Sequence, residues 1–384
     1  MQLGDWSMRL KDDCPMEIRR LFEDGANVYV TPNRFADGTP AIATLRATAL
    51  WAGLVTRNGN ELREPGGVGL LGYLQTGRGH AGVNGTHGAL PAAYPATFAE
   101  ILDSWDAYAN GLTIGTGYSP TGTTIASAPD AYTYLPPFKP PLDTYAKQTG
   151  NDYKVNPDGT LDYGAATALF RSTPTVTVAP GLVGRDTNSI LLNVVEWRAR
   201  YDLDNLRTNG SATTSDQTGS VVAATSSTKA VSFRKFGSTV ANVGLFSEWT
   251  ASDSTSTAAA DTLSQALADE TPDRHWDITC SVLEYAIGTF LTCGDWIWVY
   301  SPKDDLWNAA NQITIGGQTI LPMIMRVVGY TWPVQDGMGI AVNYDGTTTD
   351  VTEFVVMETD QPTKLELDTS PQRLNGASTV SPVR

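Results

Sequence analysis

The sequence predicts a mainly β protein with a small number of helices. Gly, Thr, Ser and Pro are plentiful, and short apolar runs alternate with turn dipeptides. The last third of the chain contains five expected strands, at 276–285, 294–301, 321–334, 338–344 and 351–358. Turn residues such as Asp336-Gly337 separate them. Strands this close together favour a small closed barrel or a sandwich.

The earlier part of the chain mixes strands with two helices. Strands are expected at 27–30, 49–56, 67–77, 173–180, 189–202 and 230–237. Residues 95–110 and 254–270 place apolar side chains at helical spacing, so we expect helices there. Residues 151–164 are expected to form a hairpin, because the turn Asn156-Pro157-Asp158-Gly159 has Pro second and Gly fourth.

One late strand has no polar face. Trp296, Trp298 and Tyr300 alternate with Ile297 and Val299. Successive side chains of a strand point to opposite faces of the sheet, so one face is aromatic and the other aliphatic. We therefore expect both faces of this strand to be covered by protein.

The net charge of −15 arises from 26 Lys and Arg residues against 41 Asp and Glu residues. Binding of nucleic acid through its phosphates needs a basic surface, and the sequence has no Lys/Arg run. We therefore expect no binding of DNA, although an acidic surface would let DNA pass without being bound. The alternative reading is that the charge serves solubility alone.

Cysteine content and the N-terminal sequence bear on the compartment. The chain has three cysteines, Cys14, Cys280 and Cys293. Because their number is odd, they cannot all pair with one another in disulfides. The first twenty residues have no apolar core of a signal peptide, and no apolar run approaches the length of a membrane span. The sequence indicates a protein that is made and folded in the cytosol.

The patterns that suggest a cofactor or metal site are weak. Two G-x-G-x-x-G matches, at 67–72 and 77–82, lack the preceding strand and following helix of a dinucleotide site. His80 and His87 share a Gly-rich loop but have no metal-ligand spacing, and His275 precedes an expected strand. We predict no cofactor and no metal.

Catalysis is equally poorly supported. No G-x-S-x-G setting for a serine nucleophile occurs. The carboxylates Asp158 and Asp162, and the pair Asp304 and Asp305, could in principle serve glycoside hydrolysis, but turn residues explain them better. We predict no catalytic residue and no enzymatic activity.

Tryptophans and a tyrosine of the C-terminal region are the strongest positive feature. Aromatic residues of this kind can form a sugar-binding platform, but they are more often core or interface residues. The candidate subunit or domain interface consists of Trp276, Trp296, Trp298, Tyr300, Trp307 and Trp332.

The order of several short motifs resembles the tail hub family of long-tailed phages, also called baseplate hub or minor tail proteins, particularly those of actinobacteria. The motifs are Trp51-Ala52-Gly53, Asp152 to Gly164, Leu291 to Tyr300, and Met325-Arg326-Val327. Each motif alone is weak, and their order and spacing over about residues 20 to 358 carry the likeness.

The resemblance implies two tube-like β-barrel domains and an α/β accessory domain. Residues 1–91 would hold the N-terminal segment and the first barrel strands, and residues 92–185 the accessory domain. Residues 186–358 would hold the second barrel with the helix 254–270 packed on it. Residues 359–384 would form an extended C-terminal tail.

The resemblance also implies a function. The chain would form a homotrimer at the distal end of the tail of a virion, assembled in the host cytoplasm. It would join tube proteins above to tip or fibre proteins below, with the tape-measure protein as a further partner, and DNA would pass through its channel without specific binding. The alternatives are a tail-associated cell-wall hydrolase and a carbohydrate-binding receptor protein. A tube or capsid subunit fits the length poorly.

Overall fold

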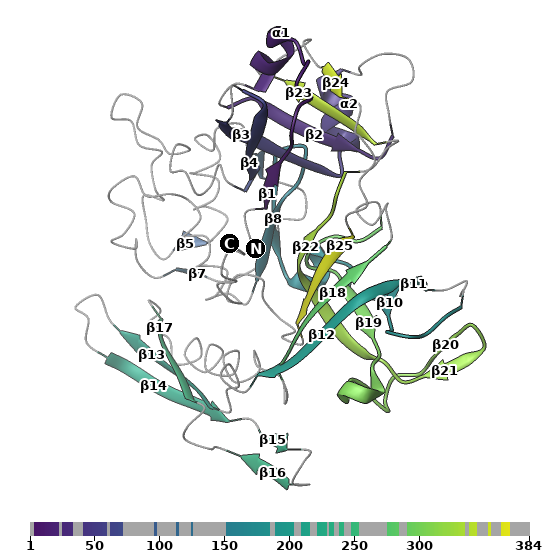
Figure 1. Cartoon of the computed structure of the whole chain (residues 1–384). Helices are drawn as coiled ribbons and strands as arrows, with labels where there is room; N and C mark the ends of the chain where they lie inside the picture. Colours follow the sequence, from purple (N-terminus) through teal and green to yellow (C-terminus); the bar gives the residue numbers. More distant parts are fainter. Residues whose placement is uncertain are drawn as a thin grey trace.

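The structure, a computed structural model, has a mainly β fold built around two sheets, as the sequence predicts. Figure 1 shows one sheet above the other in the view chosen. The structure describes residues 4–22, 25–33, 41–59, 62–71, 96–97, 113–114, 124–125, 151–184, 189–202, 209–215, 221–228, 230–233, 238–241, 247–252, 275–283, 290–334, 338–343, 352–354 and 362–368.

The first sheet is antiparallel throughout and combines the two ends of the chain. Its strand order is β1 (Asp5–Ser7), β4 (Glu64–Gly69), β3 (Trp51–Gly59), β2 (Asn27–Thr31), β23 (Gly339–Asn343) and β24 (Thr352–Phe354). Alternation along β2 sends Val28 into one hydrophobic cluster, with Phe22 of η1 (Arg20–Phe22), which follows α1 (Met16–Arg19). Tyr29 enters a second cluster, on the opposite face, with Ile42 of α2 (Ile42–Thr48).

The second sheet is a nearly closed barrel. Its strand order is β11 (Ile190–Leu192), β10 (Val176–Val178), β19 (Trp296–Val299), β22 (Met323–Thr331), β25 (Thr363–Asp368), β18 (His275–Val282) and β12 (Val194–Asp202). The two end strands, β11 and β12, follow one another in the chain with only Asn193 between them. This short connection brings the two edges of the sheet together.

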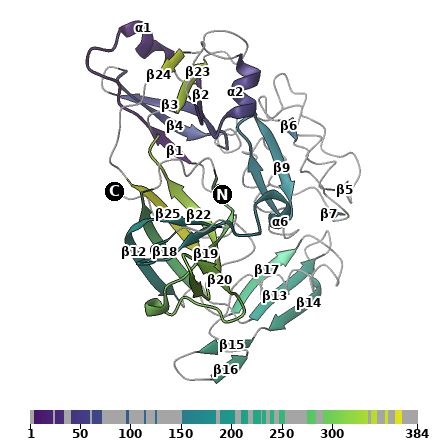
Figure 2. The ribbon, with the colours of Figure 1, turned by 90° about the vertical axis from the view of Figure 1, so that its right-hand side faces the viewer.

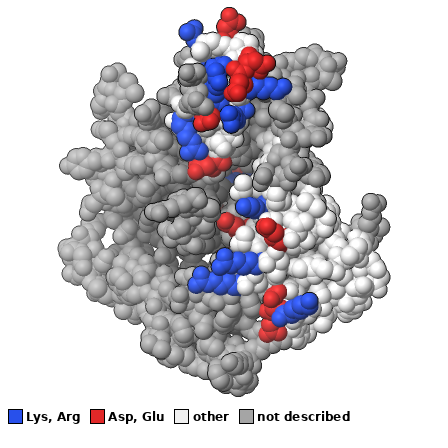
Figure 3. Space-filling view, viewed as in Figure 1, with Lys and Arg blue, Asp and Glu red and all other residues white. Residues whose placement is uncertain are grey.

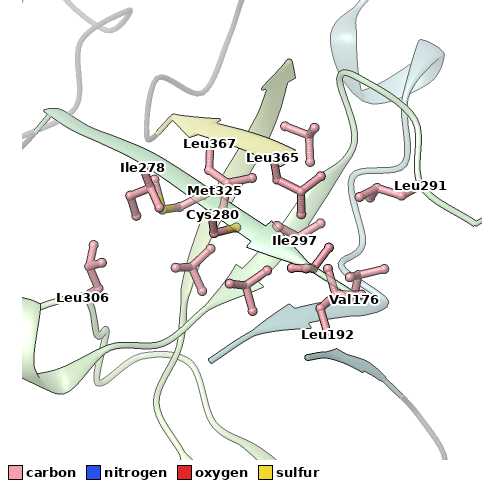
Figure 4. Packing of buried hydrophobic residues seen from close by; sticks show 14 residues of the cluster. Val176, Leu192, Ile278, Cys280, Leu291, Ile297, Leu306, Met325, Leu365 and Leu367 are labelled. Atoms are coloured by element: carbon pink, nitrogen blue, oxygen red, sulfur yellow. The ribbon is translucent and has the colours of Figure 1, made fainter. Parts of the chain in front are cut away.

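Side chains fill the barrel completely enough to make it a core rather than a pore. Figure 4 shows these side chains pointing toward one another from the surrounding strands. The cluster comprises Val176, Val178, Leu192, Ile278, Cys280, Val282, Leu291, Ile297, Val299, Leu306, Met325, Val327, Leu365 and Leu367, each at most 2% exposed. Leu291 precedes β19 and Leu306 follows it, so they enter the cluster from the two ends of that strand.

Smaller elements surround the two sheets. A three-stranded sheet contains β6 (Thr113–Ile114), β9 (Thr160–Gly164) and β8 (Asp152–Val155), followed by α6 (Ala166–Leu169). Another contains β14 (Val221–Thr228), β13 (Asn209–Ser215) and β17 (Ser247–Ser252). Two-stranded ribbons are β15 (Ala230–Phe233) with β16 (Ser238–Ala241), β20 (Ile313–Ile315) with β21 (Gln318–Ile320), and β5 (Ala96–Thr97) with β7 (Thr124–Ile125). The 3-10 helix η6 spans Pro302–Asp304.

The predicted hairpin at 151–164 is confirmed. β8 and β9 pair in antiparallel register from Asp152 opposite Gly164 to Val155 opposite Leu161. Gly159 has φ +86°, a left-handed conformation that explains why glycine occupies the fourth turn position. Asp158 accepts hydrogen bonds from the backbone N–H and the hydroxyl of Thr160, which fixes the turn.

Four strands lie outside the boundaries expected for the barrels. β23 and β24 were expected in the second barrel but pair with the N-terminal sheet. β25 falls in the expected C-terminal tail yet is an inner strand of the barrel, between β22 and β18. β10 falls in the expected accessory domain but pairs with β19 of the barrel. For β23, β24 and β10 the local pattern indicates a strand, but it does not indicate the sheet that the strand joins.

Two further expectations concern helices. The expected helix 95–110 begins instead with the strand β5 at Ala96–Thr97, and residues 98–110 lie outside the described part of the chain, as does the expected helix 254–270. The connection between β2 and β3 contains helix α2. Strands β13 and β14 pair in antiparallel register. Among the described helices, none has the length and apolar character required to traverse a bilayer.

Candidate functional site

The hairpin β8–β9 and helix α6 form a bridge between the two sheets. Val155 at the end of β8 packs against the cluster of Tyr29, Ala52 and Leu70 on the first sheet. Phe170, directly after α6, packs with Trp296 of the barrel. Figure 2 shows β9 and α6 below α2 and beside the barrel strands. We call the contacts of residues 151–171 with the two sheets the junction.

A buried ion pair lies at the centre of the junction. The carboxylate of Asp152 on β8 accepts a hydrogen bond of 2.8 Å from Nη2 of Arg326 on β22. The two side chains are 0% and 1% exposed. The guanidinium Nε also donates to the carbonyl of Gly294, at 2.9 Å. Removing two charges from water is costly, so the ion pair contributes little net free energy of folding. Its effect is to hold the hairpin on the barrel in one geometry.

Two aromatic rings enclose the same guanidinium. The central carbon of Arg326 lies 5.0 Å from the ring centroid of Phe170 and 4.6 Å from that of Trp296. Within these distances the negative face of a ring attracts a cation. The buried Nη1 atom has no hydrogen-bond partner among the described residues. The aromatic faces therefore supply part of the compensation for the desolvated charge.

The turn before β19 connects the bridge to the barrel by backbone contacts. The carboxylate of Asp295 accepts hydrogen bonds of 2.9 Å from the backbone N–H groups of Arg171 and Thr292. Gly294 has φ +107°, and a Cβ at this position would lie 2.4 Å from Cδ1 of Phe170. Glycine is thus required here both for the backbone conformation and for the close approach of the Phe170 ring.

A second connection between the sheets is covalent. After β22, the chain leaves the barrel at Trp332, which packs against the barrel core. Two residues later Val334 packs against the core of the first sheet. The two sheets are thus joined by this crossover and by the junction, which together fix their relative position.

The structure separates the aromatic residues that were grouped from the sequence. Trp296 is 9% exposed and is covered by residues of the same chain, whereas Ile297 and Val299 point into the barrel core. Trp298 and Tyr300 are half-buried, Trp332 packs on the barrel core, and Trp307 is 37% exposed. Trp276 is on β18, with its side chain outside the described part of the structure.

The sequence does not indicate that Arg326, Asp152 and Phe170 come together in one contact. Arg326 and Asp152 both fall in the motifs that resemble tail hubs, but nothing in the local pattern indicates burial of either charge. The strongest local signal for the junction is Gly294-Asp295, a dipeptide that is also common in ordinary turns.

The carboxylates weighed as catalytic residues have structural roles. Asp158 caps the hairpin turn, and Asp162 accepts a hydrogen bond of 2.8 Å from Asn156. Asp304 accepts hydrogen bonds from the Trp197 indole at 2.8 Å and from the Ser301 hydroxyl. Asp305 accepts one from the Trp307 indole, at 3.3 Å.

The glycine motif at 67–72 is explained by strand packing where it is described. Gly67 and Gly69 lie on β4, and a Cβ on Gly67 would lie 1.8 Å from the carbonyl oxygen of Leu54. Glycine is therefore needed for close pairing of β3 and β4. His80 and His87 lie outside the described residues, and His275 is the first residue of β18. The described residues contain no group of His, Cys, Asp and Glu arranged to hold a metal ion.

The described cysteines are free thiols. Burial raises the pKa of the Cys293 thiol to about 11. Its Sγ donates to the carbonyl of Val328 at 3.2 Å, next to Arg326 on β22. A thiol that stays protonated at neutral pH is a packing residue rather than a nucleophile.

Comparison with known proteins gives a result at the level of fold. No protein-family model and no curated protein matches the chain. The 43 kDa tail protein of prophage MuSo2 from Shewanella oneidensis superposes with a TM-score of 0.52 and 11% identity, over 96% of this chain and 89% of that chain. The chain shares the fold of that tail protein.

Two weaker matches are also tail proteins by description. The tail protein from Neisseria meningitidis MC58 gives a TM-score of 0.47 at 12% identity, over 91% of this chain and 95% of that chain. The prophage tail protein gp18 from Listeria monocytogenes EGD-e gives 0.45 at 11% identity, over 91% and 88%.

Proposed function

We propose that the chain is a structural protein of a phage tail, and that it forms the trimeric hub at the distal end of the tail. The observation that carries the proposal is the shared fold with the MuSo2 tail protein over nearly the full length of both chains. The hub motifs add to it, since two of them, Asp152 to Gly164 and Met325 to Val327, contribute the partners of the buried ion pair.

The junction suits a mechanical role. A ring that contains two sheets from each subunit keeps its shape only if the two sheets of one subunit keep a fixed position relative to one another. Here the bridge and the crossover after β22 supply that relation through Asp152, Arg326, Trp332 and Val334. We retain three domains in this proposal, with β23 and β24 added to the first barrel and β10 and β25 to the second.

The proposed partners follow from this position. Tube proteins would lie above the ring, tip or fibre proteins below it, and the tape-measure protein within reach of the channel. DNA would pass through the ring without specific binding, because an excess of negative charge on the chain disfavours adhesion of phosphates. The proposal assigns no enzymatic step, and the structural roles of Asp158, Asp162 and Asp304 support that choice.

Immunogold electron microscopy tests the proposal. A phage that encodes this chain would be grown with an epitope tag on the C-terminus, and intact particles would be labelled. Gold at the tip of the tail supports the hub. Gold on the capsid, or a chain missing from purified particles, overturns it. A dye-release assay with peptidoglycan and the purified chain distinguishes the hydrolase alternative from the hub, because a hub releases no dye.

A further inference from the structure

One edge strand of the barrel is long and has a strand partner on one side only. The edge strands of the two large sheets are β1, β24, β11 and β12. The first three have three residues each, whereas β12 has nine. Among the described strands, β12 pairs with β18 alone. Its other side therefore presents a row of backbone groups that no described strand covers, and we call this side the open edge.

The sequence explains why β10 does not extend along the open edge. β10 pairs with β11 in parallel up to Val178 opposite Leu192, and β12 begins two residues after Leu192. Continued pairing would bring Pro180 beside β12, but proline has no backbone N–H to donate. A turn follows instead, in which the N–H of Leu182 donates to the carbonyl of Ala179 at 3.1 Å. β10 thus ends where β12 begins.

The hydrogen-bond pattern shows which residues of β12 face the open edge. The N–H of Leu283, directly after β18, donates to the carbonyl of Asn193, directly before β12, at 3.2 Å. Alternate residues of an antiparallel strand bond to the same neighbour, so the odd-numbered residues of β18 bond to β12. Arg198 lies opposite one of them. Its neighbours Trp197 and Ala199 therefore direct their N–H and C=O groups to the open edge.

The two faces of β12 differ in chemistry. Trp197 and Ala199 pack against the barrel core, and both are half-buried. Arg198 and Arg200 lie on the opposite, outer face and are exposed. Figure 3 shows Lys and Arg side chains gathered over the strand that Figure 1 labels β12. A strand added at the open edge continues the core with its inner side chains and meets arginines with its outer ones.

The two arginines have no anionic partner within the described part of the chain. Arg198 lies opposite Thr279 and Arg200 opposite Asp277, and neither guanidinium has an ion pair or a hydrogen bond there. Glu196, on the same face, is engaged with β18, because its carboxylate accepts a hydrogen bond of 2.9 Å from a serine hydroxyl. Two guanidinium groups, on residues about 7 Å apart along the strand, are thus available to bind carboxylates.

Charged side chains on an edge strand can also keep other strands away. Opposite charges across two strands stabilise the pair, and like charges destabilise it. The arginines therefore exclude a basic strand and favour an acidic one. Phosphates of a nucleic acid would satisfy the guanidinium groups alone, whereas the backbone groups of the open edge match those of a peptide strand.

We propose that the open edge of β12 binds an extended segment of another protein, in which carboxylates alternate with apolar side chains. The segment adds a strand to the barrel by backbone hydrogen bonds to Trp197 and Ala199. Its carboxylates face Arg198 and Arg200, and its apolar side chains cover the half-buried inner residues. The proposal goes beyond the hub function, because it follows from the barrel edge alone and holds for any position of the chain in a virion.

Fluorescence anisotropy with the purified full chain tests the proposal. The probe is a labelled synthetic peptide of the length of β12, in which Glu alternates with Val. One control peptide has Lys in place of Glu. A second control peptide keeps Glu but has N-methyl groups on the backbone amides that would face β12. We expect the chain to bind the Glu peptide and neither control.

Charge reversal on the barrel gives a matched comparison. Arg198→Glu should weaken binding of the Glu peptide about tenfold, because a repulsion replaces an attraction. Lys364→Glu is the control, since Lys364 is exposed on β25, an inner strand of the same barrel, and it should leave the binding unchanged. Urea denaturation of both variants verifies that the fold is kept.

Several outcomes overturn the proposal. They are equal binding of the Glu and Lys peptides, equal binding of the N-methylated peptide, or no binding of any peptide. Tighter binding of a labelled single-stranded oligonucleotide would assign the arginines to phosphates, and self-association that Arg198→Glu abolishes would assign the open edge to a second copy. Immunogold labelling of the tail tests the hub independently of these outcomes.

Discussion

The carboxylate of Asp152 and the guanidinium of Arg326 meet at 2.8 Å, although 174 positions separate them in the chain. They join the hairpin strand β8 to the barrel strand β22, and neither side chain reaches water. A pair in this setting is sensitive to loss of one partner, because the remaining charge stays buried without its counterion.

The first prediction concerns this pair. Asp152→Asn should lower the free energy of unfolding by about 3–5 kcal/mol, because Arg326 keeps its charge in the junction. Urea denaturation monitored by tryptophan fluorescence measures the change. Arg9→Gln is the control, since Arg9 and Asp12 are 71% and 77% exposed at 4.0 Å, and it should change the free energy by less than about 0.5 kcal/mol. Equal effects of the two variants would contradict the account.

The second prediction separates the two tryptophans of β19 and its following loop. Trp296→Ala should destabilise the fold by about 3–5 kcal/mol, because it removes a buried ring that also faces Arg326. Trp307→Ala should cost far less, because that side chain is 37% exposed. Thermal unfolding of both variants decides the matter, and a Trp307 variant as unstable as the Trp296 variant would show that burial has been misassigned.

The third prediction uses two glycines that share a left-handed backbone. Gly294→Ala places a Cβ 2.4 Å from the Phe170 ring, whereas Gly317→Ala, at φ +80°, has no atom within 4 Å. The backbone cost is common to both, so the extra loss of about 1–3 kcal/mol in Gly294→Ala reports overpacking of the junction. Chemical denaturation of the two variants gives this difference. A difference near zero would mean that Phe170 does not pack on the Gly294 turn.

The fourth prediction concerns thiol reactivity. With a pKa of about 11, Cys293 has only about one thiolate in a thousand molecules near pH 8. Iodoacetamide should therefore modify the partly exposed Cys14 in the native protein and reach Cys293 only after unfolding. Peptide mass spectrometry after timed labelling measures both rates. Native labelling of Cys293 as fast as that of Cys14 would exclude the buried, protonated thiol.

The sequence predicts local features of this fold well. Alternation from Trp296 to Tyr300 places Ile297 and Val299 on the core face of β19, and Pro157 with Gly159 defines the hairpin turn. Each of these features depends on residues within a few positions, where side-chain direction and backbone preference act directly.

Pairing between distant segments is what the sequence does not show. β23 has the pattern of a strand, but whether it joins the first sheet or the barrel depends on its pairing with β2, near the other end of the chain. Trp296 and Trp298 are equivalent in the pattern, and the packing of Ala166, Leu169 and Phe170 makes Trp296 a core residue. The charge of Arg326 gives no hint of burial, because its partner Asp152 is equally unremarkable in sequence.

A reconstruction of the intact tail by cryo-electron microscopy tests the central claim most directly. The account predicts three copies in a ring at the distal end of the tube. A lone subunit, or a position of the chain away from the tail tip, would contradict it.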